Sequence, residues 1–467
     1  MTITKQRWQQ KASDGIAENP LATFFTLATL VAAFLTLPVW VPRTIAVGGL
    51  SVQVYEILLV LAAAAWLISG RPRRATDRAA AIALGLLLIA FALSYLARLD
   101  LSAIVFETRR MVVLAIAVFV AGRAFRAGGG RRYLPVLSAT LWLSTALTLV
   151  ASLTGLDLGQ RALAASLQYG DAGAAARLVT EATYPAVAVL TATICLYLMG
   201  RLPRSMWLAL VAPAALITLL SFSRNPIISF AVGVVVALLH ARSAAAVGRG
   251  VRLILSAALA VVAVWLIALL DTTGPMAQWL SAQTAGLTDR VFGGLSAQAL
   301  ASDSSALYRT DQENPYLEAA FWRSPLIGHG FGYEYKPAFT GRNYASENLA
   351  IQASRYAHNF YLWLGVKTGI VGLTAFALLA VRPALLSIRR DTSPLTAALA
   401  AALLGMMAQS VVAPMPIGSP TSLLFGAVLG MVIVGANEIR QFRTEHTRER
   451  VSLKATSRDD PLSGRSE

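Results

Sequence analysis

The sequence predicts an all-α integral membrane protein with about twelve transmembrane helices and a long, partly helical loop on the outer side between helices nine and ten. Hydrophobic residues make up 56% of the 467 residues and charged residues only 14%, whereas soluble domains are about 25% charged. The apolar residues gather in runs near the ~20 residues that a helix needs to cross a bilayer. Every second gap between these runs is rich in arginine.

Each predicted helix corresponds to one apolar run. The runs lie at about residues 21–41, 52–69, 79–97, 104–121, 136–153, 182–199, 206–221, 227–241, 253–270, 360–381, 395–412 and 423–436. The shorter runs are expected to extend into their flanks in order to span the hydrocarbon layer. The first run lacks a cleavage-site pattern, so it is predicted to be a retained helix and not a signal peptide.

The arginine clusters predict the orientation. Sixteen arginines lie in one set of alternate gaps, at residues 71–78, 122–132, 200–204, 240–252 and 382–391. The opposite short gaps carry Arg43, Arg98, Arg161, Arg177 and Arg224. Because positive residues favour the cytoplasmic side, both termini are predicted to be cytoplasmic. The resulting parts are an N-terminal segment 1–20, a membrane domain 21–436 that includes the outer loop 271–358, and a tail 437–467 that its polar composition predicts to be disordered.

Several classes of function are disfavoured by composition. A formal net charge of +16 would usually suggest a nucleic-acid partner, but membrane topology accounts for it, so membrane lipids and no nucleic acid are expected. The single cysteine, Cys195, allows no intramolecular disulfide and no Cys/His metal cluster. The sequence has no HExxH and no GxSxG motif. No metal and no cofactor are therefore predicted.

The stretch LLSFSRNPIISF, residues 219–230, places an arginine at the outer start of a predicted helix. Asn225 suits the N-cap and Pro226 the first turn. A helix N-terminus presents free N–H groups to an anion, and Arg224 beside it can bind phosphate through two parallel hydrogen bonds. The alternative is an interfacial arginine that neutralises a nearby carboxylate.

The stretch YAHNFYLWLGVKTGIVGL, residues 356–373, opens the next outer helix. His358 and Asn359 precede the apolar run, with Arg355 one turn earlier. A helix N-terminus disfavours a protonated imidazole, so His358 is expected to be neutral and able to accept a proton. The alternative is a histidine that only forms hydrogen bonds at the membrane interface.

The long outer loop contains YRTDQENPYLEAAFWRSPLIGHGFGYEY, residues 308–335. Thr310 and Glu313 fit a capping box for an amphipathic helix that ends before Pro325 and has Leu317, Ala320 and Phe321 on one face. Arg309 precedes this helix and could bind an anion, or it could pair with Asp311 or Glu313. The glycine-rich GHGFG is predicted to be a tight turn, and the sequence assigns no role to His329.

Charged residues also occur at the outer ends of two other predicted helices. Glu107, Arg109 and Arg110 lie near the start of the fourth helix, and Glu56 lies near that of the second. Charges at membrane depth are costly and usually face the bundle interior. These residues are expected to pair with one another and support the site, or to contact the ligand directly.

Three of these stretches, in order and all on the outer side, resemble the O-antigen ligase and O-antigen polymerase superfamily of bacterial inner-membrane glycosyltransferases. LLSFSRNPIISF is similar to the family's serine-arginine motif. LYRTDQENPYLEAAFWRSPLIGHGFG resembles its long-loop pattern, and HNFYLWLGVKTGIVGL resembles the motif that opens the next helix. The likeness covers residues from about 206 to 381. Lys367 departs from it, because an uncharged or acidic residue is expected there.

The resemblance implies a glycan donor carried on undecaprenyl pyrophosphate and a periplasmic active site in the inner membrane. Arg224 and Arg309 would hold the pyrophosphate, and His358 would activate the acceptor hydroxyl. Transfer would be metal-independent and would invert the anomeric carbon. The acceptor would be lipid A–core in a ligase, or another lipid-linked repeat unit in an O-antigen or exopolysaccharide polymerase, and the sequence does not separate these two.

Two other classes of function fit twelve helices. A flippase for lipid-linked oligosaccharide would usually show repeat symmetry and polar residues near the midplane, whereas the candidate residues here lie near the outer rim. A non-catalytic scaffold of an envelope assembly is the other alternative.

Overall fold

The computed structural model describes residues 19–47, 50–69, 75–128, 130–158, 178–270, 274–288, 293, 307–337 and 354–437. It is mostly helical, at 78%. One antiparallel pair of strands, β1 (Thr44–Val47) and β2 (Leu50–Gln53), occurs in the described part. The predicted disordered tail and most of the predicted N-terminal segment lie outside the described residues.

A helix forms over each of the twelve apolar runs. In chain order these are α2 (Pro20–Phe34), α3 (Val54–Ile68), α4 (Ala75–Leu96), α5 (Leu101–Arg126), α6 (Gly130–Thr154), α7 (Thr183–Leu198), the π-helical turn η1 (Trp207–Val211) with α8 (Ala212–Leu220), α9 (Asn225–Ala241), α10 (Ala244–Leu270), α16 (Phe360–Phe376) continued by η5 (Ala377–Val381) and α17 (Arg382–Ser387), α18 (Pro394–Gln409), and the last helix (Thr421–Asn437). The long connection before α16 contains α11 (Pro275–Leu287), η4 (Tyr308–Glu313) and α14 (Asn314–Arg323).

By length and composition, four of these helices could cross a membrane among the described residues: Ala75–Leu96, Arg132–Thr154, Ala244–Ala263 and Phe360–Ser387. Seven further apolar helices are shorter. α5 is long but carries several charged residues, including Glu107, Arg109 and Arg110. The apolar helices support a membrane protein, and the crossing of a bilayer by all twelve stays a prediction.

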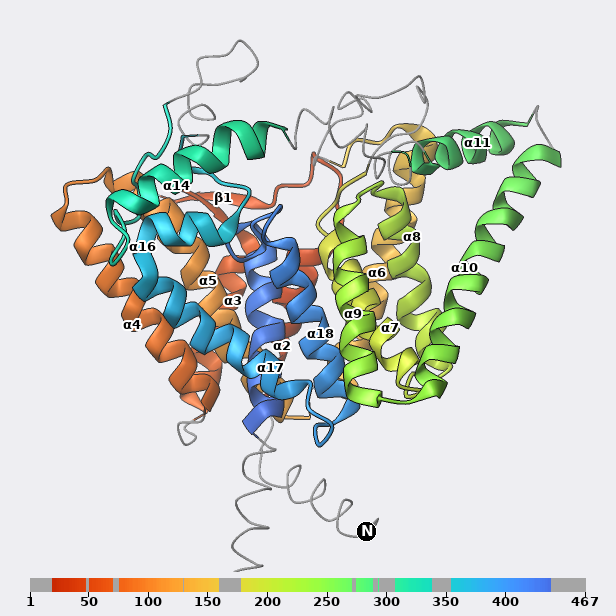
Figure 1. Ribbon diagram of the computed structural model, residues 1–467, viewed down its shortest axis with the longest axis horizontal. Coiled ribbons are helices and arrows are strands. Elements are labelled where there is room, and N and C mark those ends of the chain that lie inside the picture. Colours follow the sequence, from red (N-terminus) through yellow and green to blue (C-terminus); the bar gives the residue numbers. More distant parts are fainter. Residues whose placement is uncertain are drawn as a thin grey trace, which may run out of the picture.

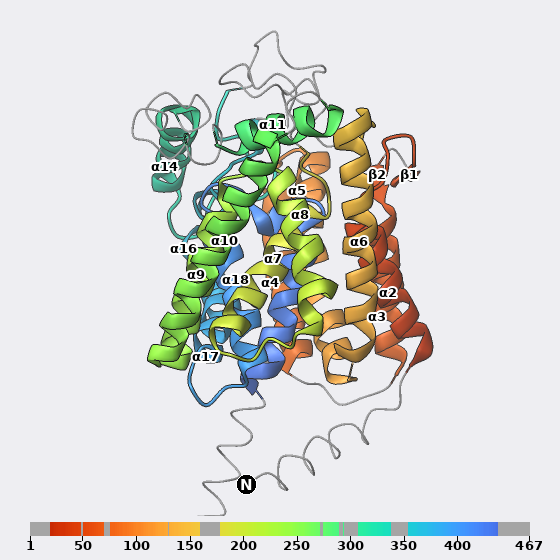
Figure 2. The ribbon, with the colours of Figure 1, turned by 90° about the vertical axis from the view of Figure 1, so that its right-hand side faces the viewer.

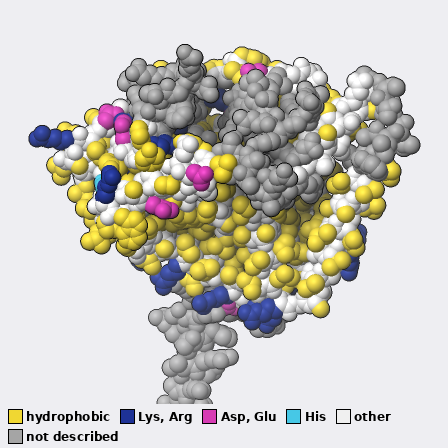
Figure 3. Space-filling view, turned by 45° about the horizontal axis from the view of Figure 1, so that its top comes forward, with side chains coloured by type: hydrophobic (Ala, Val, Ile, Leu, Met, Phe, Trp, Pro, Cys, Tyr) yellow, Lys and Arg dark blue, Asp and Glu magenta, His cyan; other side chains and the backbone are white. Residues whose placement is uncertain are grey.

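The helices stand side by side in a bundle whose two ends differ (Figures 1 and 2). α11, α14 and the β1–β2 hairpin lie at one end, which we call the loop end. The start of α2 and the end of the last helix lie at the opposite end. Hydrophobic side chains cover the flank between the ends, and several Lys and Arg side chains gather along the edge away from the loop end (Figure 3).

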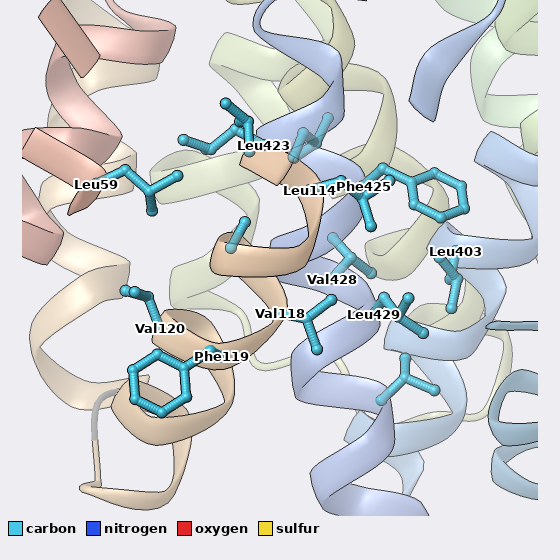
Figure 4. Packing of buried hydrophobic residues seen from close by; sticks show 14 of the residues in the cluster. Leu59, Leu114, Val118, Phe119, Val120, Leu403, Leu423, Phe425, Val428 and Leu429 are labelled. Atoms are coloured by element: carbon cyan, nitrogen blue, oxygen red, sulfur yellow. The ribbon is translucent and has the colours of Figure 1, made fainter. Parts of the chain in front are cut away.

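The centre of the bundle is a close contact between α5 and the last helix. A Cβ atom added to Gly426 would come within 2.3 Å of the carbonyl oxygen of Leu114, and one added to Gly430 within 2.4 Å of that of Val118. Small residues let helix backbones approach in this way, and Leu423, Phe425, Val428 and Leu429 pack around the contact (Figure 4). This core fixes α5, whose other end carries Glu107.

The structure changes the predicted tenth helix, because α16 is broken at Gly369. This glycine has φ +62° and ψ −163°, a conformation that is strongly disfavoured for residues other than glycine. The turn that contains GHGFG packs into the break, where an added Cβ would come within 2.3 Å of the Leu326 carbonyl group. The two parts of α16 run in different directions (Figure 1).

Four backbone hydrogen bonds join the turn to the broken helix. His329 N donates to Val366 O at 2.8 Å and Gly330 N to Lys367 O at 2.9 Å, while Ile370 N donates to Pro325 O and Val371 N to Leu326 O. Backbone groups freed by a helix break must find partners in an apolar environment. The turn supplies them, and it thereby fixes the long loop on the first part of α16.

Candidate functional site

The site is built around the first turn of α16, at the loop end of the bundle. Asn359 is the N-cap, and its side-chain oxygen accepts hydrogen bonds from Tyr361 N at 3.0 Å and Leu362 N at 3.2 Å. The predicted position of His358 and Asn359 at a helix N-terminus is confirmed. The Asn359 side chain thus satisfies two of the free helix N–H groups, and His358, one residue earlier, makes a different contact.

That contact is the carboxylate of Glu313. The backbone N–H of His358 donates to Oε1 at 2.6 Å, and Nδ1 of the ring lies 3.2 Å from Oε1 and 3.1 Å from Oε2. Because an ionised carboxylate only accepts hydrogen bonds, Nδ1 carries the proton, and Nε2 is the acceptor in the neutral ring. Glu313 is 1% exposed, whereas the His358 side chain is 30% exposed.

A lysine and three tyrosines surround this pair. Lys336 Nζ donates to the hydroxyl oxygen of Tyr308 at 2.9 Å and lies 3.4 Å from Glu313 Oε2. The rings of Tyr356 and Tyr308 meet the imidazole edge-on, with centroids 5.2 Å and 6.5 Å away. Tyr335 donates its hydroxyl proton to the Tyr356 carbonyl oxygen. The two neighbouring rings therefore restrict the imidazole.

The electrostatics favour an ionised Glu313. Burial by itself raises the pKa of this carboxyl, but the hydrogen bonds and charge of His358, together with the charge of Lys336, outweigh burial and lower the pKa below its ordinary value. The carboxylate therefore stays charged at neutral pH and can orient the ring beside it.

Glu313 does not have the predicted capping role. Thr310 Oγ1 bonds to Leu307 O and to Asp311 Oδ1, and η4 runs without interruption into α14, so no helix begins at Thr310. One signal was present in the sequence: Glu313 shares the i, i+4, i+7 face of buried Leu317 and Ala320. A carboxylate on a buried helix face needs a partner.

Arg224 is the N-cap residue of α9, and Asn225, predicted to be the cap, is instead its first residue. Gln409 Nε2 donates to Asn225 O at 3.0 Å. The next residue of α18's end, Ser410, accepts a hydrogen bond through its carbonyl oxygen from Phe360 N at 2.9 Å. The end of α18 therefore contacts the starts of both α9 and α16, which adjoin Arg224 and His358.

The turn before Arg224 has an unusual backbone. Phe222 is 2% exposed and has φ +40°, a region that a bulky residue seldom adopts. Such conformations persist only where the surrounding structure holds them.

Arg309 follows Tyr308 in η4. Arg224, Arg309 and His358 therefore all belong to segments at the loop end.

The four predicted supporting residues divide into separate clusters. Glu107 was expected to pair with Arg109 or Arg110, but it does not. Its carboxylate lies 2.7 Å from Lys367 Nζ and accepts a hydrogen bond from Gly332 N at 2.7 Å. Lys367 is 1% exposed and also donates to Tyr333 O. Lys367 thus neutralises Glu107 and ties α5 and α16 to the turn.

Arg109 and Arg110 pair with Glu56 of α3, at 3.3 Å and 3.8 Å, and Arg109 also donates to Ser51 O at 2.8 Å. The predicted pairing of these two arginines with Glu56 is confirmed, and it joins α5 to α3. Arg355 pairs with Glu334 at 2.6 Å and with Asp100 at 3.4 Å. It therefore connects the loop to the start of α5.

His329 has partners within the turn. Its Nε2 lies 2.8 Å from Ala320 O, and its ring stacks on Tyr333 with centroids 4.1 Å apart. Within the described ranges, no group of three or more His, Cys, Asp and Glu side chains could hold a metal ion. The arrangement at His358 offers a proton acceptor with a buried carboxylate behind it.

Comparison with known proteins gives a family match for one segment of the chain. Residues 208–377 match a family model described as O-antigen ligase. The matched segment contains Arg224, Arg309, Glu313 and His358, and it coincides closely with the region in which the sequence motifs occur. A comparison with curated proteins found no match. Residues 208–377 are therefore similar to the O-antigen ligase family, whose activity is in general that of a glycosyltransferase.

Proposed function

We propose that this protein transfers a glycan from undecaprenyl pyrophosphate to an acceptor hydroxyl at the periplasmic face of a bacterial inner membrane. The loop end of the bundle is the periplasmic end in this proposal, and both termini are cytoplasmic. The family match supports glycan transfer in general. The arginine-rich connections at residues 71–78, 122–132 and 382–391 support the orientation.

His358 acts as the general base. Its Nε2 accepts the proton of the acceptor hydroxyl while that oxygen forms a bond to the anomeric carbon. The bond from the anomeric carbon to the phosphate oxygen breaks, and undecaprenyl pyrophosphate leaves with the electron pair. Attack from the face opposite to the leaving group inverts the anomeric carbon. No metal takes part in this scheme.

Arg224 and Arg309 hold the pyrophosphate and stabilise the charge that develops on it as it leaves. A guanidinium group suits this role because it presents paired donors to phosphate oxygens. Both residues lie within the matched O-antigen ligase segment. Arg355, Arg109, Arg110 and Glu107 support the site through the ion pairs that connect its segments.

The observation that carries the proposal is the setting of His358. Its ring is partly exposed and its Nδ1 faces a buried carboxylate, so Nε2 is the acceptor in the neutral ring. A histidine that served only to fill space at an interface would not need a buried carboxylate behind it. Geometry of this kind is shared by histidine bases that act through Nε2.

Substitution of the base and of one arginine tests the proposal. His358→Ala and Arg224→Ala should abolish glycan transfer in a complementation assay of a deletion strain, while both proteins still insert in the membrane. Arg204→Ala, an exposed arginine at the opposite end of the bundle, is the matched control and should transfer normally. Wild-type transfer by both His358→Ala and Arg224→Ala would disprove the proposal.

The glycans of the deletion strain identify the acceptor. Lipid A–core without attached polymer indicates a ligase. Single repeat units on the carrier or on lipid A–core indicate an O-antigen or exopolysaccharide polymerase.

A further inference from the structure

We propose that Glu313 is the positioning residue of this site: its carboxylate fixes the tautomer and orientation of His358 and stabilises the imidazolium that forms during transfer. The inference rests on the proposed function, because it assigns the partner of the general base. It gives a role to the buried carboxylate that the sequence motifs left unexplained.

The carboxylate holds His358 at two points. Oε1 accepts a hydrogen bond from the backbone N–H at 2.6 Å, and both oxygens lie within 3.2 Å of Nδ1. The backbone contact fixes the residue, and the ring contact fixes the rotation of the imidazole. The edge-on rings of Tyr356 and Tyr308 further limit the movement of the imidazole. Nε2 is thereby aimed away from Glu313.

A purely structural role does not account for the charge. Glu313 is 1% exposed, and a buried carboxylate carries a large desolvation penalty unless it is paired and hydrogen-bonded. A glutamine could accept the same backbone hydrogen bond without that penalty. The protein instead keeps a carboxylate and places Lys336 3.4 Å from it. The charge itself is therefore useful, and its nearest titratable neighbour is the imidazole.

The proton balance shows where the charge acts. The acceptor hydroxyl gives its proton to Nε2, so the ring carries protons on both nitrogens and has a positive charge. Nδ1–H still points at the Glu313 carboxylate, which stabilises that cation without taking the proton. When the pyrophosphate product leaves, Nε2 returns the proton to solvent or to the departing phosphate, and the site is reset.

Turnover by Glu313→Gln separates the positioning role from a structural one. The assay uses purified protein in proteoliposomes, with lipid-linked donor isolated from the deletion strain and the acceptor that its glycans identify. We expect kcat to fall ~10²–10⁴-fold, the range for loss of general-base catalysis, with KM for the donor unchanged. Glu313→Asp, which keeps the charge, should retain more activity than Glu313→Gln.

Glu318→Gln is the matched control. It lies on the same helix and is exposed, so its kcat should equal that of the wild type. Folded Glu313→Gln protein with wild-type kcat would overturn the inference, and inactive His358→Ala protein would in that case leave the proposed function intact. Wild-type transfer by both His358→Ala and Arg224→Ala would instead disprove the proposed function itself.

A measurement on the wild-type protein tests the inference even if the glutamine variant does not fold. The chain has four histidines, so ¹⁵N-histidine labelling gives few signals, and loss of one in His358→Ala assigns it. The neutral ring of His358 should carry its proton on Nδ1. A neutral ring protonated on Nε2 would overturn the inference.

Discussion

Two buried glutamates near the loop end, Glu107 and Glu313, show how similar charges have different consequences. Glu107 is 7% exposed, and its oxygens meet Lys367 Nζ and Gly332 N, each at 2.7 Å. Both partners are themselves held within the protein. Glu313 is 1% exposed, and its oxygens meet Lys336 and His358.

The two glutamates differ in whether the side chain that each one contacts is itself exposed. Lys367 is 1% exposed, and its ammonium group also donates to Tyr333 O, so we call the Glu107–Lys367 pair the closed pair. The His358 side chain is 30% exposed and retains a second ring nitrogen. A buried charge therefore indicates chemistry only where its partner reaches a surface that a substrate can reach. The Glu107 pair instead fixes three segments to one another.

The largest expected difference between the two regions is in activity. His358→Ala should reduce transfer by ~10²–10⁴-fold, the usual contribution of a general base. His329→Ala removes the other histidine of this region, whose Nε2 contacts only the Ala320 carbonyl among its polar partners in the described structure. It should lower stability by about 0.5–1.5 kcal/mol and leave transfer per folded molecule unchanged. Equal loss of transfer in both variants would remove the distinction.

Breaking the closed pair should have the largest effect on stability. Lys367→Met leaves the Glu107 carboxylate buried without its cation and should destabilise the protein by ~3–5 kcal/mol. The double variant Glu107→Gln with Lys367→Met removes both charges and keeps an acceptor for Gly332 N, so it should recover most of that loss. Chemical denaturation in detergent micelles measures both. A double variant as unstable as Lys367→Met would show that the charge pair is not the cause.

The Glu313–His358 pair should contribute to the pH dependence of stability. The folded-state pKa of Glu313 lies below its ordinary value of 4.5, so the ionised group stabilises the fold above about pH 4.5 and loses this contribution as the pH falls through the lower folded value. The stability difference between wild type and Glu313→Gln should therefore shrink on acidification below pH 4.5. A difference that stays constant from pH 7 to pH 3 would contradict the assignment.

The smallest effect is expected at Arg355. Its partners Asp100 and Glu334 have side chains that are 50% and 47% exposed, and ion pairs with exposed partners are worth ~0–1 kcal/mol. Arg355→Ala should reduce stability by no more than this amount, and a double-mutant cycle with Glu334→Ala should give a coupling energy in the same range. A coupling energy above about 2 kcal/mol would place Arg355 with the closed pair and outside the range for exposed pairs.

Much of the fold followed from local patterns. Apolar runs predicted the positions of twelve helices, because a helix that crosses the hydrocarbon layer needs a run of about 20 apolar residues. The N-terminus of α16 and the pairing of Arg109 and Arg110 with Glu56 were also predicted. The break in α16 was not, although Gly369 permitted it, because the break depends on a turn some forty residues earlier in the chain that supplies the missing hydrogen bonds.

The sequence by itself determined the helical class and the alternation of apolar runs with charged gaps. It also identified His358, Arg224 and Arg309 as candidates. Each of these features depends on residues that are close together in the chain. Only the tertiary structure decided the partners. Glu313 and His358 are 45 residues apart, and Glu107 and Lys367 are 260 apart. A local pattern assigned Glu313 to a helix cap. Its actual partner was not predicted, because the imidazole belongs to a distant part of the chain. Pairing of charges is a property of distance in space, and packing sets that distance.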